Sequence, residues 1–505
     1  MVYVIALDVG TSSMRAVLYN EQGALMHAVS REYHTIFPKP SHVEQDPKTW
    51  SQTAEETLSG VAEYAKSRGI SISAISVTSQ RASLIPMDAQ GQPLHPAIMW
   101  QDKRTIGICD RLARDYGVPA LHERTGLRIN PFFVLNKIIW LKENEPDLFA
   151  RTQRFIGVQD YVIYHLTGQY VTDWTQASRT MLMDLKTFRW DESLLKIASI
   201  REDQLCELVP PGSVAGGLRA RLARRCGLNV SLPVIVSGGD QQNAAIALGV
   251  TRPGMAEANT GTGSFLLSFA SKPVFDAKNR VLCQAAAIAG SYVTETPIFN
   301  TGAILRWFRE QFCPDLRQLP NPYALMTAEA EQVAPGSNGV LLMPHFEGAA
   351  APNWDPHAKG LFFNLGLATT RGMMIRAIYE GIAMEIAANL DLMRDLTGTI
   401  DAVHVAGGMT RADLFCSIQA SAYNTRVIRH ENPEASSLGA CCNALVSLKV
   451  IPSADAFFRR MAASQDAFDP EPESVGIYRR IGAKRQMLYQ ALAQSDVYEA
   501  FMGSV

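Results

Sequence analysis

The stretch that decides the fold lies at the amino terminus, where residues 2–20 read VYVIALDVGTSSMRAVLYN. An apolar run ends at Asp8, a glycine and three hydroxyl residues follow, and the alternating segment MRAVLYN comes next. Two strand-like segments joined by a short polar turn predict a β-hairpin. Gly23 supplies a left-handed turn position before residues 24–33, so the first thirty residues are expected to form a hairpin or meander.

A helix is predicted directly after this meander. Asp46 is a favourable N-cap, Pro47 fits the first helical position, and Gly69 suits the far end. The strand-like segment ISAISVTSQ follows at residues 72–80. The chain therefore opens with the order β-β-β-α-β rather than a plain β-α-β alternation.

The same kinds of element recur in the rest of the chain. LPVIVSGGD at residues 232–240 is typical of a buried strand, and a short helix is expected from QQNAAIALG. The segment TRPG, residues 251–254, is the clearest linker signal, and it predicts one domain over 1–250 and another over 251–505. A long helix is expected around residues 375–393, where apolar side chains recur at helical spacing. The fold class is α/β, in two halves of similar size.

An internal similarity supports this division. DVGTSS at residues 8–13 and NTGTGS at residues 259–264 share glycine, threonine and serine at matching offsets. Both lie between two predicted strands. Two copies of one device, facing each other, are therefore plausible.

Composition limits the class of protein. The 505 residues are 47% hydrophobic and 19% charged, with a formal net charge of -2, which gives no support for nucleic acid or an anionic membrane as a partner. The eight cysteines form no C-x-x-C pair, so reduced and mostly buried thiols are expected. No apolar run approaches the ~18 residues of a membrane-spanning helix, and the amino terminus does not resemble a signal peptide. These features predict a soluble cytoplasmic protein.

The first turn has the chemistry of a phosphate site. Glycines in the turns at residues 10 and 261 let backbone N–H groups approach an anion closely. Hydroxyl and guanidinium donors add to the first turn, at Thr11, Ser12, Ser13 and Arg15. An acid such as Asp8 is out of place beside phosphates unless a cation lies between them, so the pattern implies Mg²⁺. A plain polar hairpin turn is the alternative interpretation.

Two further strand ends have functional potential. In SGGDQQ, residues 237–242, Asp240 is a candidate base for a substrate hydroxyl and equally a good helix N-cap. In AGGMTRADLF, Gly407 and Gly408 follow a strand, a position that ligands favour in open α/β sheets and that tight strand–helix packing also explains. The usual Walker and protein-kinase signatures are missing.

Together these segments resemble the FGGY family of carbohydrate kinases, over a span from Asp8 to about Leu448. The frame is most similar to the glycerol kinases, through SQRASLIPMD, AIMWQDKRT, RTGLRINPFF, TDWTQASRTML, SGGDQQNAAIALG, the TGTG turn and GAAAPNWDP. The resemblance implies two ribonuclease-H-like domains, of the actin, hexokinase and heat-shock chaperone superfamily, flanking a cleft. It also implies ATP and Mg²⁺ as cofactors, transfer of the γ-phosphoryl group to a hydroxyl of a small sugar or polyol, and a possible homodimer.

The resemblance assigns roles to residues at matching positions. Asp240 is the expected catalytic base, and Asp8 and Asp240 are the expected metal-side acids. The residues expected to bind the nucleotide are Thr11, Ser12, Ser13, Arg15, Gly261, Thr262, Gly302 and Gly407. The residues expected to bind the sugar are Arg81, Trp100, Phe132, Asp240 and Gln241. Trp100 offers an apolar face for a sugar, although a packed core tryptophan explains it as well.

Two positions depart from the glycerol kinases, which carry an acid where this chain has Ala82 and a tyrosine where it has Phe132. Loss of a hydrogen-bonding group around which a site was built changes discrimination by up to about 10⁴–10⁵. The expected substrate is therefore a pentulose, D-xylulose or D-ribulose. Alternatives are glycerol or another short polyol, a catalytically idle nucleotide-binding regulator, and an ATPase chaperone. The xylulokinase pattern also differs, because Arg81 and Ala82 stand where those enzymes have methionine and histidine.

Overall fold

The computed structural model describes residues 1–316, 319–430, 434–461 and 465–502. The chain divides into two compact units. Unit 1 consists of Met1–Ala247, Ala270–Val293 and Glu434–Ala463, and unit 2 consists of Leu248–Phe269, Thr294–Pro433 and Ser464–Val505. Each unit has its own sheet and its own hydrophobic core.

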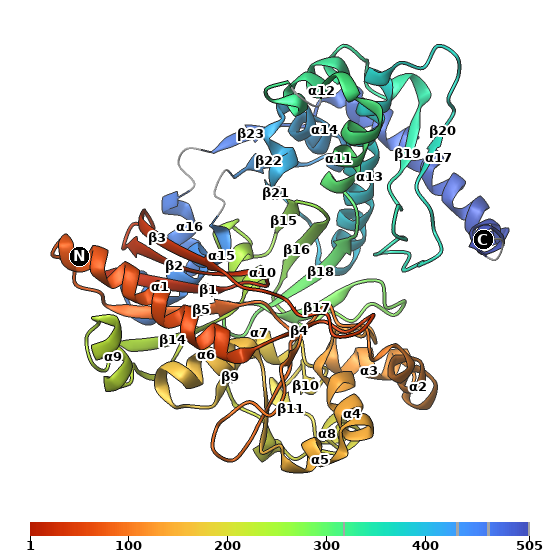
Figure 1. Ribbon diagram of the computed structural model, residues 1–505. Helices are drawn as coiled ribbons and strands as arrows, with labels where there is room; N and C mark the ends of the chain where they lie inside the picture. The colour runs from red at the N-terminus through yellow and green to blue at the C-terminus, as the bar shows by residue number, and fades with distance from the viewer. Residues whose placement is uncertain (317–318, 431–433, 462–464, 503–505) are drawn as a thin grey trace. The chain divides into compact units, whose positions relative to one another are not determined.

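Unit 1 is built on a six-stranded sheet with the order β13-β14-β5-β1-β2-β3 (Figure 1). The strands are β1 (Tyr3–Val9), β2 (Ser13–Asn20), β3 (Leu25–Glu32), β5 (Ala74–Ser79), β13 (Ser213–Gly217) and β14 (Pro233–Gly239). β1 pairs antiparallel with β2 and parallel with β5, and β14 pairs parallel with β5. This is the ribonuclease-H-like arrangement. The predicted meander, helix and strand are confirmed, with α1 (Pro47–Ser67) capped by the Asp46 side chain.

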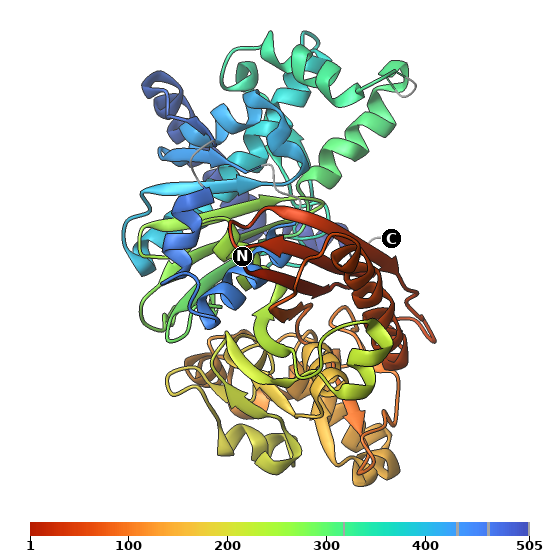
Figure 2. The ribbon, with the colours of Figure 1, turned by 90° about the vertical axis from the view of Figure 1, so that its left-hand side faces the viewer.

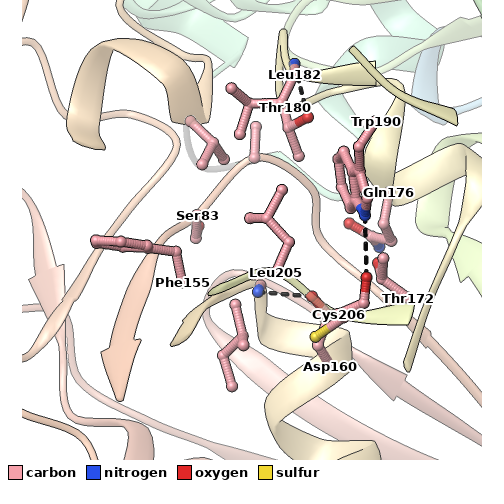
Figure 3. A pocket seen from close by; sticks show the side chains of 14 residues that line it. Ser83, Phe155, Asp160, Thr172, Gln176, Thr180, Leu182, Trp190, Leu205 and Cys206 are labelled. Atoms are coloured by element: carbon pink, nitrogen blue, oxygen red, sulfur yellow. Dashed lines mark hydrogen bonds between the residues drawn. The ribbon is translucent and has the colours of Figure 1, made fainter. Parts of the chain in front are cut away.

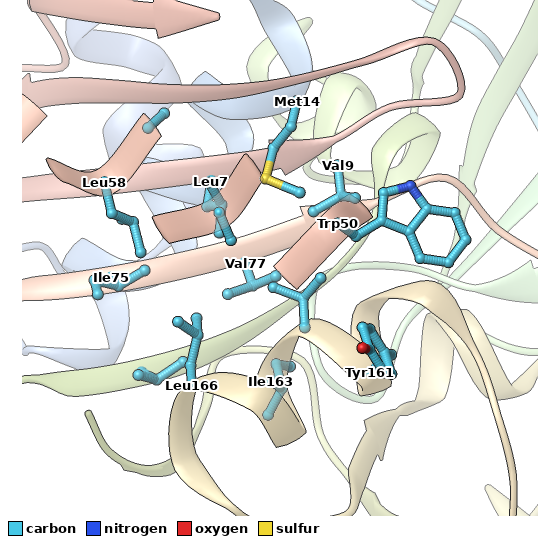
Figure 4. Close-up of a cluster of buried hydrophobic side chains, with 14 of the residues drawn as sticks. Leu7, Val9, Met14, Trp50, Leu58, Ile75, Val77, Tyr161, Ile163 and Leu166 are labelled. Carbon is cyan, nitrogen blue, oxygen red and sulfur yellow. The ribbon is translucent and has the colours of Figure 1, made fainter. Parts of the chain in front are cut away.

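The first strand is apolar because it is buried on both faces. Ile5, Leu7 and Val9 pack against α1 and α6 (Val158–Thr167), as part of the cluster in Figure 4. Val4 and Ala6, which alternate with them, pack on the opposite face. Trp50 of α1 is fully buried in the first of these layers.

The opposite face of this sheet is covered by a segment from late in the chain. α15 (Ala435–Ser447) packs on β1, β5 and β14, and its residues Leu438, Cys441 and Leu445 join Val4 and Ala6 in one core. The division of the chain therefore differs from a single boundary at residue 250. The sheet needs a cover on each face, and α15 provides the second cover.

A mostly helical part of unit 1 lies at one end of it, drawn in orange to yellow in Figure 2. Its helices are α2 (Ile106–Tyr116), α3 (Val118–Thr125), α4 (Val134–Asn144), α5 (Pro146–Arg151) and α8 (Glu192–Ala198). These helices enclose a third cluster of buried apolar side chains. The remaining helices of the unit are α7 (Trp174–Ala177), α9 (Ala220–Cys226), α10 (Asp240–Ala247) and α16 (Ala454–Met461).

Unit 2 repeats the arrangement, with neighbouring strands in the order β18-β16-β15-β21-β22-β23. These are β15 (Met255–Thr260), β16 (Ser264–Ala270), β18 (Tyr292–Ile298), β21 (Ala402–Ala406), β22 (Arg426–Arg429) and β23 (Asp466–Phe468). β15 pairs antiparallel with β16 and parallel with β21, as β1 does with β2 and β5. The predicted second copy of the strand–turn–strand device is thus present.

Helices pack around this second core. They are α11 (Gly302–Phe312), α12 (Pro322–Glu331), α13 (Arg371–Thr397), α14 (Asp413–Tyr423), α17 (Pro472–Gln494) and α18 (Val497–Met502). The long helix expected around residues 375–393 is α13, whose Ile375, Ile382 and Leu390 are fully buried. Among the described helices, none combines the length and apolar character needed to cross a bilayer. All eight cysteines are buried and unpaired, as expected.

Candidate active site

Asp8 stands at the end of β1 with an unsatisfied carboxylate oxygen. The residue is partly exposed, but its Oδ1 is inaccessible and has no hydrogen-bond partner within the described residues. Burial, followed by the nearby charges of Asp240 and Glu434, raises the pKa of Asp8 to about 7, and Arg15 opposes that shift. A bound cation would satisfy the orphaned oxygen and favour its ionised form. The site therefore fits Mg²⁺.

The donor set around Asp8 agrees with this choice of ion. The described part of the chain contains no group of three or more His, Cys, Asp or Glu side chains arranged to hold a metal. Mg²⁺ is commonly held by one or two carboxylates together with the phosphates of a substrate. Asp8 and Asp240 are such a pair of carboxylates.

The turn after Asp8 leaves backbone donors available. Gly10 N–H bonds the Ser13 carbonyl at 3.0 Å, and the Gly10 carbonyl accepts from Gln80 Nε2 at 3.1 Å. The N–H groups of Thr11 and Ser12 donate to no acceptor in the part of the chain that the structure describes. Successive free N–H groups in a turn form a concavity that binds anions.

Arg15 has a partner that the sequence did not suggest. Its guanidinium bonds the carboxylate of Glu434, at the start of the segment that returns to unit 1. The Arg15 side chain remains 44% exposed. A phosphate ligand would therefore have to share or replace this carboxylate.

Asp240 begins α10 directly after the two glycines that end β14. Its Oδ1 accepts the Gln241 N–H at 2.7 Å and lies 3.5 Å from Arg81 Nε. The side chain keeps 25% of its surface exposed, so the carboxylate remains accessible at the first position of the helix. A Cβ at Gly239 would lie only 2.5 Å from Arg81 Cδ, which explains why glycine precedes the acid.

Arg81 is held by two glutamine side chains. Its Nη1 donates to Gln242 Oε1 at 3.1 Å and to Gln284 Oε1 at 3.0 Å, and Gln242 Nε2 donates to the same Gln284 oxygen. Gln284 belongs to β17 (Leu282–Ala285), and no pattern in the sequence indicates its role. The guanidinium is thus fixed in a polar layer beside Asp240.

An aromatic pair lies near the first turn. The rings of Trp100 and Phe132 meet edge to face, with their centroids 5.8 Å apart. Trp100 Nε1 donates to Thr11 Oγ1 at 3.0 Å, so the indole is tied to the predicted phosphate turn. Gln241 contributes an inaccessible Oε1 without a partner in the described residues. Trp100 thus links Phe132 to the first turn, while Arg81 lies beside Asp240.

A small cavity lies beside Ala82 and Ser83 (Figure 3). It measures about 30 Å³, which is room for about one water molecule. Asp160 also lines it, with an Oδ1 that lacks a hydrogen-bond partner among the described residues. Burial raises the pKa of Asp160 to about 7. A whole sugar does not fit this cavity.

Unit 2 contains a much larger pocket of about 720 Å³, a size typical of ligand sites. Three of the predicted nucleotide residues line it, Gly261, Thr262 and Gly302. Polar side chains that the sequence did not single out line it as well, including Arg306, Asn321, Arg411 and Asp413.

Close backbone contacts shape this pocket. Gly302 begins α11, and its N–H bonds the Gly261 carbonyl at 3.0 Å, where a Cβ would come within 2.4 Å of that oxygen. Gly407 has φ of 104°, and its Cβ would lie 2.1 Å from the Thr260 carbonyl. Gly407 therefore supports the turn, while Gly408 lines the pocket.

Comparison with known families identifies the chain. The model of the FGGY carbohydrate kinase N-terminal domain matches residues 3–247, and that of the C-terminal domain matches residues 256–448. The chain belongs to the FGGY family of carbohydrate kinases.

Individual relatives agree with this membership. The gluconokinase of Bacillus subtilis is 30% identical over 485 residues, covering 95% of this chain and 94% of the relative. The glycerol kinase of Thermococcus gammatolerans is 34% identical over 447 residues, 87% of each chain. The crystal structure of xylulose kinase from Rhodospirillum rubrum matches with a TM-score of 0.92 and 26% identity, covering 97% of this chain and 99% of that one.

FGGY membership fixes the class of reaction. The chain is an ATP-dependent phosphotransferase whose acceptor is a hydroxyl group of a sugar or polyol. Within unit 1 of this FGGY kinase, Asp8, Asp240 and Arg81 lie close enough to influence or contact one another. The large pocket of unit 2 is the natural candidate for the nucleotide.

Proposed function

We propose that this FGGY kinase transfers the γ-phosphoryl group of ATP to a hydroxyl of a pentulose, D-xylulose or D-ribulose. One observation carries the choice of substrate. Arg81 and Asp240 form a polar layer with Gln242 and Gln284, but the neighbouring residue is the apolar Ala82. No acid at that position accepts the hydroxyl of a short polyol, and a longer substrate brings further hydroxyls of its own to the accessible carboxylate of Asp240.

The proposed mechanism assigns each group in unit 1 a task. Asp240 accepts the proton of the attacking hydroxyl, while Arg81 orients the substrate and Trp100 covers its apolar face. Asp8 and Asp240 would hold Mg²⁺, which would neutralise charge on the phosphates. The first turn and Arg15 bind phosphate oxygens. Phosphoryl transfer needs mainly this alignment and charge neutralisation.

In unit 2, the large pocket takes the nucleotide. The N–H groups of Thr262 and Gly263, which donate to no acceptor among the described residues, contact its phosphates, and the rest of the pocket takes the adenosine. Because Gly407 has no side chain, the Thr260 carbonyl can lie close to its backbone beside this pocket. A cytoplasmic location and a homodimer stay predictions from the sequence and the resemblance.

Gluconate is a second candidate substrate, favoured by the charge of the same pocket. Arg81 Nε lies 3.5 Å from the carboxylate of Asp240, and residue 82 adds no negative charge. A guanidinium in such a site pairs well with a substrate carboxylate. The relatives named gluconokinase are consistent with this alternative.

A substrate panel tests the proposal. ADP release is measured with D-xylulose, D-ribulose, gluconate and glycerol. The highest kcat/KM should belong to a pentulose, and ADP release without an acceptor should be negligible. Gluconate as the best substrate would replace the pentulose, whereas acceptor-independent turnover would favour an ATPase chaperone. Absence of turnover with every acceptor would favour an idle nucleotide-binding regulator.

Ala82→Glu tests the residue on which the choice of substrate depends. The kcat/KM for glycerol relative to D-xylulose should rise about tenfold, because the new acid accepts hydroxyls of the short polyol. Ala220→Glu, on the exposed first turn of α9, is the matched control and should leave the ratio unchanged. An unchanged ratio in the Ala82 variant would remove this residue from the specificity argument.

A further inference from the structure

A fully buried lysine lies behind the proposed sugar pocket. Lys137 of α4 has no exposed surface. Its Nζ donates to the carbonyl of Ala82 at 2.6 Å and to the carbonyl of Phe132 at 2.7 Å. One side chain thus connects two chain segments that are 50 residues apart.

Both carbonyls belong to segments that form the proposed pocket. Ala82 follows Arg81 and has φ of 64°, a left-handed conformation that an alanine adopts only at a cost. Phe132 meets Trp100 edge to face. The Lys137 amine therefore fixes the backbone at both positions where this chain departs from the glycerol-kinase pattern.

A neighbour on the same helix strengthens this connection. Asn136 Nδ2 donates to the carbonyl of Asn130 at 2.6 Å, and Asn130 Oδ1 accepts the Phe132 N–H at 3.1 Å. The beginning of α4 thus holds the loop at residues 130–133 by several bonds. Lys137 alone extends the connection to Ala82.

The protonation state of Lys137 matches the number of hydrogen-bond acceptors around its amine. Burial lowers its pKa to about 7, the charge of Asp102 raises it, and that of Arg104 lowers it. Arg104 is itself paired with Asp102 and Glu44. A neutral amine has two N–H donors, which equals the number of acceptors that the described residues supply. The third donor of an ammonium group would lack an acceptor there.

We infer that Lys137 is a positioning residue for the acceptor substrate, because it holds Ala82 and Phe132 in place through their carbonyls. This inference rests on the proposed location of the sugar pocket. It predicts that loss of the amine weakens sugar binding and leaves nucleotide binding intact. If Lys137 served stability alone, its loss would not change sugar binding separately from nucleotide binding.

The test compares Lys137→Met with Lys142→Met, an exposed lysine of the same helix that bonds Ser199 Oγ and lies away from Ala82 and Phe132 in sequence. The KM for D-xylulose and the KM for ATP are measured separately. For Lys137→Met, the KM for D-xylulose should rise about tenfold, as expected for two lost buried hydrogen bonds, while the KM for ATP stays within about twofold. Lys142→Met should change neither. An unchanged KM for D-xylulose in a folded Lys137→Met protein overturns the inference.

A second measurement uses the intact side chain and does not depend on that variant folding. D-xylulose binding is followed by calorimetry between pH 6 and pH 9 in protein carrying Asp8→Asn and Asp160→Asn, which removes the titration of both carboxyl groups in this range. Binding should weaken as pH falls below about 7, because the protonated amine has three N–H donors and its site supplies two acceptors. A flat profile overturns the inference, whether or not Lys137→Met folds.

Failure of the proposed substrate would look different. If the unmodified enzyme phosphorylates glycerol and no pentulose, the substrate proposal fails, and the same Lys137 comparison is made with glycerol. If the pentulose is phosphorylated and both KM values of the variant match those of the control, only the role of Lys137 fails.

Discussion

The two hairpins of the molecule share a frame and differ in charge. Residues 8–13 and 259–264 carry glycine, threonine and serine at the same offsets, and each lies between an antiparallel pair of strands whose first member also pairs parallel with a later strand. At the first offset, however, unit 1 has Asp8 and unit 2 has Asn259. The backbone geometry is common to both, while the carboxylate is present in one copy.

The difference extends to how each turn is supported. A Cβ at Gly263 would lie 2.6 Å from the Ile298 carbonyl, whereas the matching Ser12 is exposed. The turn of unit 2 is therefore packed closely on its own backbone. The turn of unit 1 is open, and beside it stands a partly exposed carboxylate with one inaccessible, unsatisfied oxygen. One frame can thus serve nucleotide binding in one unit and charge-dependent chemistry in the other.

The largest effect is expected from removing the base that we propose in unit 1. Asp240→Asn should lower kcat by about 10²- to 10⁴-fold, because the amide cannot accept the proton of the substrate hydroxyl. ATP binding, measured by calorimetry, and the melting temperature should change little. Asp46→Asn is the control, because asparagine caps α1 as well as aspartate does. Near-full activity of Asp240→Asn would contradict the assignment of the base.

Asp8→Asn makes the first hairpin like the second at its first position. The Mg²⁺ concentration for half-maximal rate should rise at least about 10-fold, since even indirect metal contacts are worth 10- to 100-fold. Titration of activity with MgCl₂ checks this, again with Asp46→Asn as control. An unchanged Mg²⁺ requirement would mean that the carboxylate of Asp8 does not give the first hairpin a different function from the second.

The same variant should change how stability depends on pH. The pKa of Asp8 is about 7 in the folded protein and 3.8 when unperturbed, so between these values the folded state binds more protons than the unfolded state. Its contribution to the free energy of unfolding therefore falls as pH rises from about 4 to 7. Urea unfolding at pH 5 and pH 8 should show a smaller difference for Asp8→Asn than for the unmodified protein. Equal differences would show that Asp8 titrates normally.

The smallest effect concerns the close packing of the second hairpin. Gly407→Ala should lower the free energy of unfolding by about 1–3 kcal/mol or more, because alanine is strained at φ of 104° and its Cβ meets the Thr260 carbonyl. Gly261→Ala is the matched comparison for stability, since the nearest atom to its Cβ is 3.8 Å away. Equal melting temperatures for the two variants would contradict this account of the turn.

Much of the fold was predictable because its signals are local. The hairpin at residues 2–20, the Asp46 cap of α1 and the apolar stripe of α13 all depend on neighbouring residues. The return of residues 434–463 to unit 1 was not predictable. No pattern in the sequence of α15 indicates which sheet its apolar face covers.

The same distinction applies to the candidate site. Asp8 and Asp240 could be identified because an acid near glycines at the end of an apolar strand is an unusual local sequence pattern. Gln284, which bonds Arg81, and Glu434, which bonds Arg15, come from distant segments that only the tertiary fold brings close. Lys137 escaped notice because lysine side chains are normally exposed.

The late return of α15 has a consequence for biosynthesis. While a ribosome is still making the first 430 residues, the apolar side chains of Val4 and Ala6 on one face of the first sheet have no α15 to cover them. Apolar surface exposed during synthesis invites aggregation or capture by chaperones. The domain that begins the polypeptide is therefore among the last parts of it to be completed.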